Sequence, residues 1–198
     1  MSVLVAIASS SDEPARAPVA TAPAPPPLVA QKPATKQPPT ASDLLSARQL
    51  RIPVEGVARS QLRDTFDDKR GVGRKHKAID IMAPWGTPVL AADDGRIAKI
   101  SSNRAGGLSL YQVDASGRLV YYYAHLAGYA DDLREGQQVR RGDVIGYVGA
   151  TGNAPATAPH LHFAVLVLAQ ERRWWGGEPV NPYEALARDE TVTASAGR

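Results

Sequence analysis

The four histidines of the chain lie in short blocks whose spacing suits metal binding and acid–base chemistry. His160 and His162 open the apolar run HLHFAVLVL, and residues two apart in a strand face the same side of a sheet, with Cα atoms roughly 6.5 Å apart. His76 and Asp80 also face the same way if the chain between them is extended. His125 ends the run YYYAH, which places it at the rim of a sheet. These five residues are the candidates for chemistry.

A mononuclear zinc site with an exchangeable water needs three protein donors at about 2.0–2.2 Å. The chain has no cysteine, so imidazole and carboxylate groups must supply them. Taken alone, His76 in a basic run would usually be a solvated surface residue, and His125 a hydrogen-bonded core or rim residue. Two adjacent imidazoles at the head of an apolar strand are different, because both need partners when buried. The spacing therefore favours a metal site and leaves open which of His160 and His162 is the ligand.

Other catalytic and binding patterns are absent from the sequence. It has no HExxH motif, no GxSxG elbow and no phosphate-binding loop. Without cysteine, disulfides, thiolate metal sites and a cysteine nucleophile are excluded. The net charge of +3 suits an anionic polymer, but the basic residues are not interleaved with aromatic ones as in single-strand binders. No stretch approaches the ~20 apolar residues of a membrane span. We expect neither a nucleic-acid partner nor an integral membrane segment.

The elements that must position these residues are strands. Apolar and polar residues alternate in four segments bounded by turns, namely 88–100, 108–126, 135–152 and 160–168. Helical periodicity is nearly absent and internal repeats are not found. The expected fold class is all-β, built mainly of antiparallel sheets.

Composition divides the chain into four parts, at 1–8, 9–52, 53–186 and 187–198. The first fits either a signal-sequence remnant or a short apolar N-terminus without a role, and the others are a Pro/Ala-rich tether, a folded domain and a tail. The tether cannot bury enough apolar surface to offset its ordering entropy, so it should be disordered. A short helix is expected near its end, at 42–50, with Ser42 as the N-cap.

Several blocks in order resemble the LytM/lysostaphin-type zinc metallopeptidases, peptidase family M23. They are LRDTFDDKRGVGRKHKAIDIMAPWGTPVLAADDGRIAKI, YYYAHL, EGQQVRRGDVIGYVGATGN and PHLHF, within residues 62–186. The combination of HxxxD, YAHL and HLH at these spacings is highly specific to that family. The resemblance implies a LytM/duplicated-hybrid-motif-like arrangement of sheets.

The resemblance also implies roles for the five candidate residues. His76, Asp80 and His162 match the ligands of one zinc ion per chain. His125 and His160 match the two catalytic histidines outside the ligand set. Which of these two is the general base is left open.

The activity implied by the resemblance is hydrolysis of peptide cross-links in bacterial peptidoglycan. Zinc would lower the pKa of a bound water toward ~7 and polarise the scissile carbonyl, while the two other histidines would transfer protons. A protein that acts on peptidoglycan peptides is expected to be exported to the periplasm or cell envelope. We expect a monomer.

Two alternatives to an active enzyme remain. A non-catalytic cell-wall-binding or hydrolase-activating module would keep the same fold. The stretch EGQQVRRGDVIGYVG also resembles the hammerhead sequence of biotinyl and lipoyl carriers, although the corresponding turns contain no modifiable lysine.

Two positions, Ala78 and Ala164, depart from the commonest pattern of the family, and neither is an expected ligand. Strand parity makes Tyr121 or Tyr123 the candidates for orienting the imidazoles.

Overall fold

The alternating segments of the sequence form antiparallel strands in the computed structural model, which describes residues 40–168 and 174–188. In chain order the elements are α1 (Ala41–Ser46), η1 (Arg59–Gln61), β1 (Ile79–Met82), β2 (Pro88–Leu90), β3 (Gly95–Asn103), β4 (Gly107–Asp114), β5 (Leu119–Tyr129), β6 (Gln138–Val139), β7 (Val144–Val148), β8 (His160–Val167), β9 (Glu178–Val180) and α2 (Tyr183–Ala187). Within these residues every strand pair is antiparallel, so the expected all-β class is confirmed.

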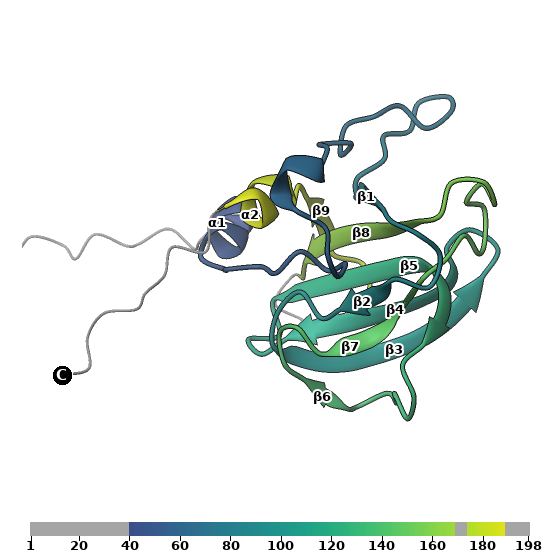
Figure 1. The fold of residues 1–198 in the computed structure, drawn as a ribbon. Coiled ribbons are helices and arrows are strands. Elements are labelled where there is room, and N and C mark those ends of the chain that lie inside the picture. The colour runs from purple at the N-terminus through teal and green to yellow at the C-terminus, as the bar shows by residue number, and fades with distance from the viewer. Residues whose placement is uncertain (1–39, 169–173, 189–198) are drawn as a thin grey trace, which may run out of the picture. The chain divides into compact units, whose positions relative to one another are not determined.

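The strands follow the order β1-β8-β5-β4-β3-β6, with β9 added to β8. β7 pairs with β2 and also with the far end of β5, and Figure 1 shows β2 and β7 in front of the long strands. The core contains side chains from both groups, including Val89 of β2, Ile145 of β7 and Phe163 of β8, all fully buried. The sheet is therefore folded over a core, which leaves the other face of β8 and β5 open to a site.

The folded part of the chain begins before the boundary expected at residue 53. The helix expected at 42–50 is α1, and its N-cap is Thr40 rather than Ser42: the Asp43 amide donates to Thr40 Oγ1 at 3.2 Å, and the Thr40 amide donates to Asp43 Oδ2 at 2.9 Å. Leu45 and Leu50 are buried in the core. The expected signal remnant, most of the tether and most of the tail lie outside the described residues.

A buried ion pair joins this N-terminal segment to the sheet. Arg48 pairs with Asp114 at the β4–β5 turn, and the Asp114 side chain is completely buried. Asp114 Oδ1 also accepts hydrogen bonds from the amides of Arg118 at 2.8 Å and Leu119 at 2.9 Å. Burial alone raises the pKa of Asp114, but the hydrogen bonds from Ser116, Leu119 and Arg118 and the charge of Arg48 outweigh it and lower the pKa.

Asp114→Ala is expected to lower the free energy of unfolding at pH 7 by about 3–5 kcal/mol, because it leaves a part-buried guanidinium and two amides without their acceptor. The pKa of Asp114 is below 3.8 in the folded state, so its contribution is present above that pH and is lost as the pH falls further. The difference in the free energy of unfolding between Asp114→Ala and wild type should therefore become smaller as the pH is lowered. Urea unfolding at pH 7 and near pH 3 measures this, with the exposed Asp131→Ala as control. Equal midpoints for the two variants at pH 7 would contradict it.

Candidate metal centre and active site

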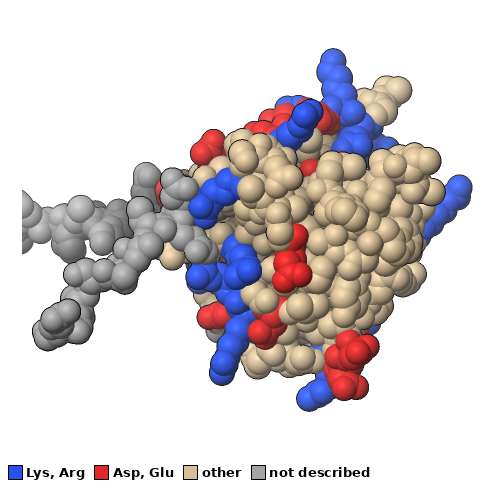
Figure 2. All heavy atoms as spheres, viewed as in Figure 1, with Lys and Arg blue, Asp and Glu red and all other residues tan. Residues whose placement is uncertain are grey.

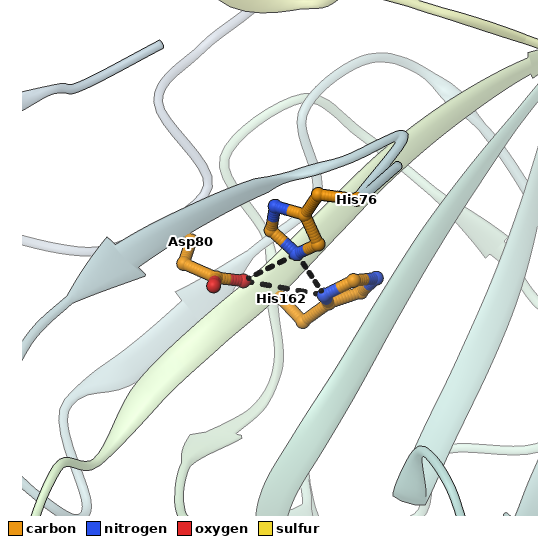
Figure 3. A group of neighbouring side chains, drawn as sticks. All are labelled: His76, Asp80 and His162. Carbon is orange, nitrogen blue, oxygen red and sulfur yellow. Dashed lines mark hydrogen bonds and ion pairs between the residues drawn. The ribbon is translucent and has the colours of Figure 1, made fainter. Parts of the chain in front are cut away.

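Three side chains converge on one point beside β8. His76 Nε2 lies 3.0 Å from Asp80 Oδ1 and 3.0 Å from His162 Nδ1, and the last two atoms are 3.2 Å apart. Figure 3 shows the three side chains pointing toward one another from the segment before β1, from β1 and from β8. Within the described residues this is a group whose donor atoms could hold a metal ion. The structure thus brings together the three residues that the sequence suggested as ligands.

Strand register places two of the three donors. β1 pairs with β8 so that Asp80 is directly opposite His162. His76 precedes the strand and is held by a backbone hydrogen bond from its amide to the Asp68 carbonyl at 2.8 Å. Lys77 between them has a left-handed backbone with φ of 59°. The turn at Lys77 lets His76 face the same point as Asp80, although the two are not on one continuous strand.

Thr65 supports two of the donors and was missed by the sequence reasoning. Its carbonyl accepts a hydrogen bond from His76 Nδ1 at 3.0 Å, and its hydroxyl accepts one from the Asp80 amide at 3.1 Å. Because a carbonyl only accepts, Nδ1 of His76 must carry the proton, and its Nε2 has a free lone pair facing the site. Nothing in the spacing marks Thr65, because one contact uses a carbonyl that every residue has and the other uses a hydroxyl that lies 15 residues before Asp80.

Arg70 was also missed. Its guanidinium pairs with Asp80 Oδ2, and Nη2 lies 3.3 Å from each ring nitrogen of His76. The pair leaves the other carboxylate oxygen directed at the imidazoles. Burial alone raises the pKa of Asp80, but its interactions with the His162 and His76 rings outweigh burial and lower the pKa, so the carboxyl group is ionised at neutral pH.

The two remaining histidines lie next to this centre. The His125 ring is 5.0 Å from that of His160 and 5.5 Å from that of His162, between centroids. His125 Nδ1 donates to the Thr151 carbonyl at 2.8 Å, and His160 Nδ1 donates to the Ala158 carbonyl at 2.8 Å. In the tautomer that each of these hydrogen bonds favours, the proton is on Nδ1 and Nε2 has a free lone pair. Burial lowers the pKa of His125 below 6.5 in spite of its hydrogen bond to Thr151, which favours the neutral ring at pH 7.

His125 reaches the site through an irregular backbone. Its φ is 62°, in the left-handed region that non-glycine residues rarely adopt. The pairing of β5 with β4 and with β7 shifts register nearby. Gly149 packs against this bend so closely that a Cβ there would lie 2.4 Å from the Ala127 nitrogen. A bulge of this kind redirects a side chain, and as a result the consecutive residues Ala124 and His125 both line the cavity.

The bend also explains why the expectation for the two tyrosines was wrong. Tyr121 and Tyr123 share parity with His125 in the sequence, but both side chains enter the core. The Tyr121 hydroxyl donates to Asp93 Oδ2 at 2.8 Å, and the Tyr123 hydroxyl donates to Gln112 Oε1 at 2.7 Å. Neither orients an imidazole, and the tyrosine that lines the cavity is Tyr122.

All five candidate residues line one cavity of about 320 Å³. Its sides are formed by the loop before β1 and by the segments around Gly106 and Ala154. Another cavity, of about 380 Å³, lies around the β4–β5 turn and Trp174 and contains no histidine. We place the chemistry in the smaller one because the convergent donors are there. None of the helices in the described parts of the chain is long and apolar enough to cross a membrane.

An antiparallel sheet that presents two imidazoles and a carboxylate to one point, with two more imidazoles beside them, defines a candidate metal-dependent hydrolase. Residues 74–182 match the family described as Peptidase family M23, and the chain belongs to that family. The matched range contains all five candidate residues, and the expectation drawn from the resemblance is confirmed at the level of the family.

Named relatives and a solved structure agree with this assignment. The chain is 36% identical over 135 residues to the L-Ala--D-Glu endopeptidase of Bacillus subtilis (strain 168), covering 65% of this chain and 41% of that protein. It is 37% identical over 92 residues to the glycyl-glycine endopeptidase ALE-1 of Staphylococcus capitis, covering 46% of this chain and 24% of that protein. A zinc containing peptidase from Vibrio cholerae superposes with a TM-score of 0.53 at 29% identity, covering 72% of this chain and 40% of that one. The chain thus spans less than half the length of each.

Proposed function

We propose that the protein is a zinc-dependent endopeptidase that hydrolyses peptide cross-links of bacterial peptidoglycan. The observation that carries the proposal is the meeting of three donor atoms within about hydrogen-bond distance, beside two imidazoles with available Nε2 atoms. The names of the relatives, which are endopeptidases, support the reaction class.

The donor set fits zinc. Two imidazole nitrogens and one carboxylate oxygen, with no thiolate, form a common three-ligand set of catalytic zinc sites. We propose His76, Asp80 and His162 as these ligands, held by Thr65 and Arg70. When bound, the ion would supply a Lewis acid toward the peptide carbonyl.

His125 and His160 are proposed to move the protons. The Nε2 of one neutral ring would take a proton from the water that attacks the carbonyl carbon. A proton held on Nε2 would then pass to the nitrogen of the departing amine as the C–N bond breaks. The hydrogen bonds from Nδ1 to the Thr151 and Ala158 carbonyls hold both rings in the tautomer that this requires.

The proposed substrate places the protein in the cell envelope. A hydrolase of peptidoglycan must be exported, and the Pro/Ala-rich sequence ahead of the folded part suits a tether between an envelope anchor point and the wall. The relatives are named for different bonds, so membership of the family does not by itself define the bond that is cut.

Removal of the metal is expected to abolish activity. The full chain loaded with zinc should release soluble muropeptides from purified sacculi, and a chelator should stop the release because the residual donors cannot polarise the carbonyl. Adding zinc back should restore it, with about one ion per chain by metal analysis. Mass spectrometry of the fragments identifies the bond. A protein that binds sacculi but releases nothing when loaded would instead be a non-catalytic module.

A further inference from the structure

The cavity that holds the five candidate residues has one cationic side. The loop between Phe66 and His76 forms a small hairpin. The backbones of Lys69 and Lys75 form an isolated antiparallel β-bridge, and the Arg70 amide donates to the Arg74 carbonyl at 2.9 Å. Arg70, Arg74 and Lys75 all line the cavity. Figure 2 shows Lys and Arg side chains, with Asp or Glu side chains among them, at the upper edge of the molecule, where Figure 1 places the loop before β1.

The three cations differ in whether they are paired with a carboxylate of the protein. Arg70 is paired with Asp80. Lys75 Nζ lies 3.0 Å from Asp67 Oδ1, an oxygen that it shares with Lys77 at 3.1 Å. Arg74 is exposed, and among the described residues it has no carboxylate partner. Of the three, Arg74 is therefore the cation whose guanidinium is not paired with a carboxylate of the described residues.

The rest of the cavity does not balance this charge. Asp80 is the single carboxylate in its lining, and it already faces Arg70 and the imidazoles. The lining also includes the neutral residues Ala105 and Gly106 and the segment from Asn153 to Pro155. A neutral peptide would gain little from such a surface, whereas an anionic one would be attracted and oriented by it.

We propose that Arg74, assisted by Lys75, binds a carboxylate group of the substrate peptide. This inference rests on the proposed function and deepens it: the preferred substrate is a cross-link peptide with a free carboxylate near the scissile bond, rather than a neutral glycine bridge. A guanidinium binds a carboxylate through two parallel hydrogen bonds, which fixes orientation as well as adding affinity. The loop would thereby set the position of the peptide relative to the proton-transferring histidines.

The test compares two forms of one substrate. Cross-linked muropeptides are isolated from sacculi, and half of them are converted to carboxamides with carbodiimide and ammonium. The zinc-loaded full chain should cleave the carboxylate form with a kcat/KM at least about 10-fold higher. Arg74→Gln should lower kcat/KM for the carboxylate form by about 10-fold or more and change that for the amidated form less than about 2-fold. Arg74→Lys, which keeps the charge but not the planar fork, should lie between.

Controls separate this role from others. Arg134→Gln removes an equivalent exposed charge outside the cavity and should change neither rate. Arg74 is exposed, so the thermal unfolding of Arg74→Gln should match wild type. Equal cleavage of both forms by the wild type, or an equal loss on both forms in Arg74→Gln, would overturn the inference and leave the endopeptidase proposal standing.

Binding measurements cover the case in which no bond is cut. Calorimetric titration of the two muropeptide forms into wild type and Arg74→Gln does not need turnover. Preferential binding of the carboxylate form that is lost in Arg74→Gln would support the inference even if hydrolysis fails. Absence of any preference in binding would overturn it whatever the activity.

Discussion

His162→Ala is expected to reduce the release of muropeptides from sacculi by on the order of 10³-fold or more, because it removes one of three proposed ligands and leaves two donors facing each other. His162 lies at the centre of the site, opposite Asp80 on β1 and opposite Ala124 on β5. The affinity for zinc should fall by on the order of 100-fold or more, measured by competition with a chromophoric chelator.

The matched control for that variant is His160→Ala. It removes an imidazole two residues earlier on the same strand, yet it should retain about one zinc per chain while losing turnover, since His160 is proposed to act on protons. If His162→Ala still released the same fragments at a comparable rate, the assignment of the ligands would be wrong. If His160→Ala lost zinc as completely as His162→Ala, the division of roles along β8 would be wrong.

His125→Asn is expected to lower kcat by on the order of 10²–10⁴-fold while zinc binding and stability stay close to wild type. The variant suits this position because asparagine tolerates the left-handed backbone that His125 adopts, at a φ of 62°. Single-turnover digestion of muropeptides measures the rate, metal analysis measures the zinc content, and urea unfolding measures the stability.

His125→Ala tests the same role with a residue that fits the backbone less well. Its turnover should fall as far as that of His125→Asn, but its free energy of unfolding should be about 1 kcal/mol lower than that of the asparagine variant. Retention of most of the activity in either variant would remove His125 from the proposed mechanism. Loss of zinc from His125→Asn would mean that the side chain supports the ligands instead.

Much of the site could be predicted because it follows from periodicity. An HxH pair on a strand must place both rings on one face, and Asp80 meets His162 because β1 pairs with β8 in antiparallel register. His76 is different, because it lies before β1 and faces the site only through the left-handed turn at Lys77. What could not be predicted depends on interactions that leave no residue-type signal. Thr65 acts through its carbonyl as well as its hydroxyl, and Arg70 is brought in by a loop.

The errors have physical reasons that concern particular residues. Parity assigned Tyr121 and Tyr123 to the site, but the left-handed turn at His125 reverses the alternation just beyond them. Composition assigned residues up to 52 to the tether, because the segment 40–52 follows a proline-rich run and is too short to show a clear pattern of its own. Two leucines of that segment are nevertheless buried, which only the tertiary structure reveals.

The ion pair between Arg48 and Asp114 shows that the folded part of this chain includes residues ahead of the family match. The family match begins at residue 74, yet Leu45 and Leu50, well upstream of it, pack in the hydrophobic core, and Arg48 pairs with the buried carboxylate of Asp114. The family match thus covers the part that contains the candidate site, whereas the hydrophobic core extends further toward the N-terminus. A shortened protein cut to the family match alone would lose Leu45 and Leu50 from its core and Arg48 from its ion pair with Asp114.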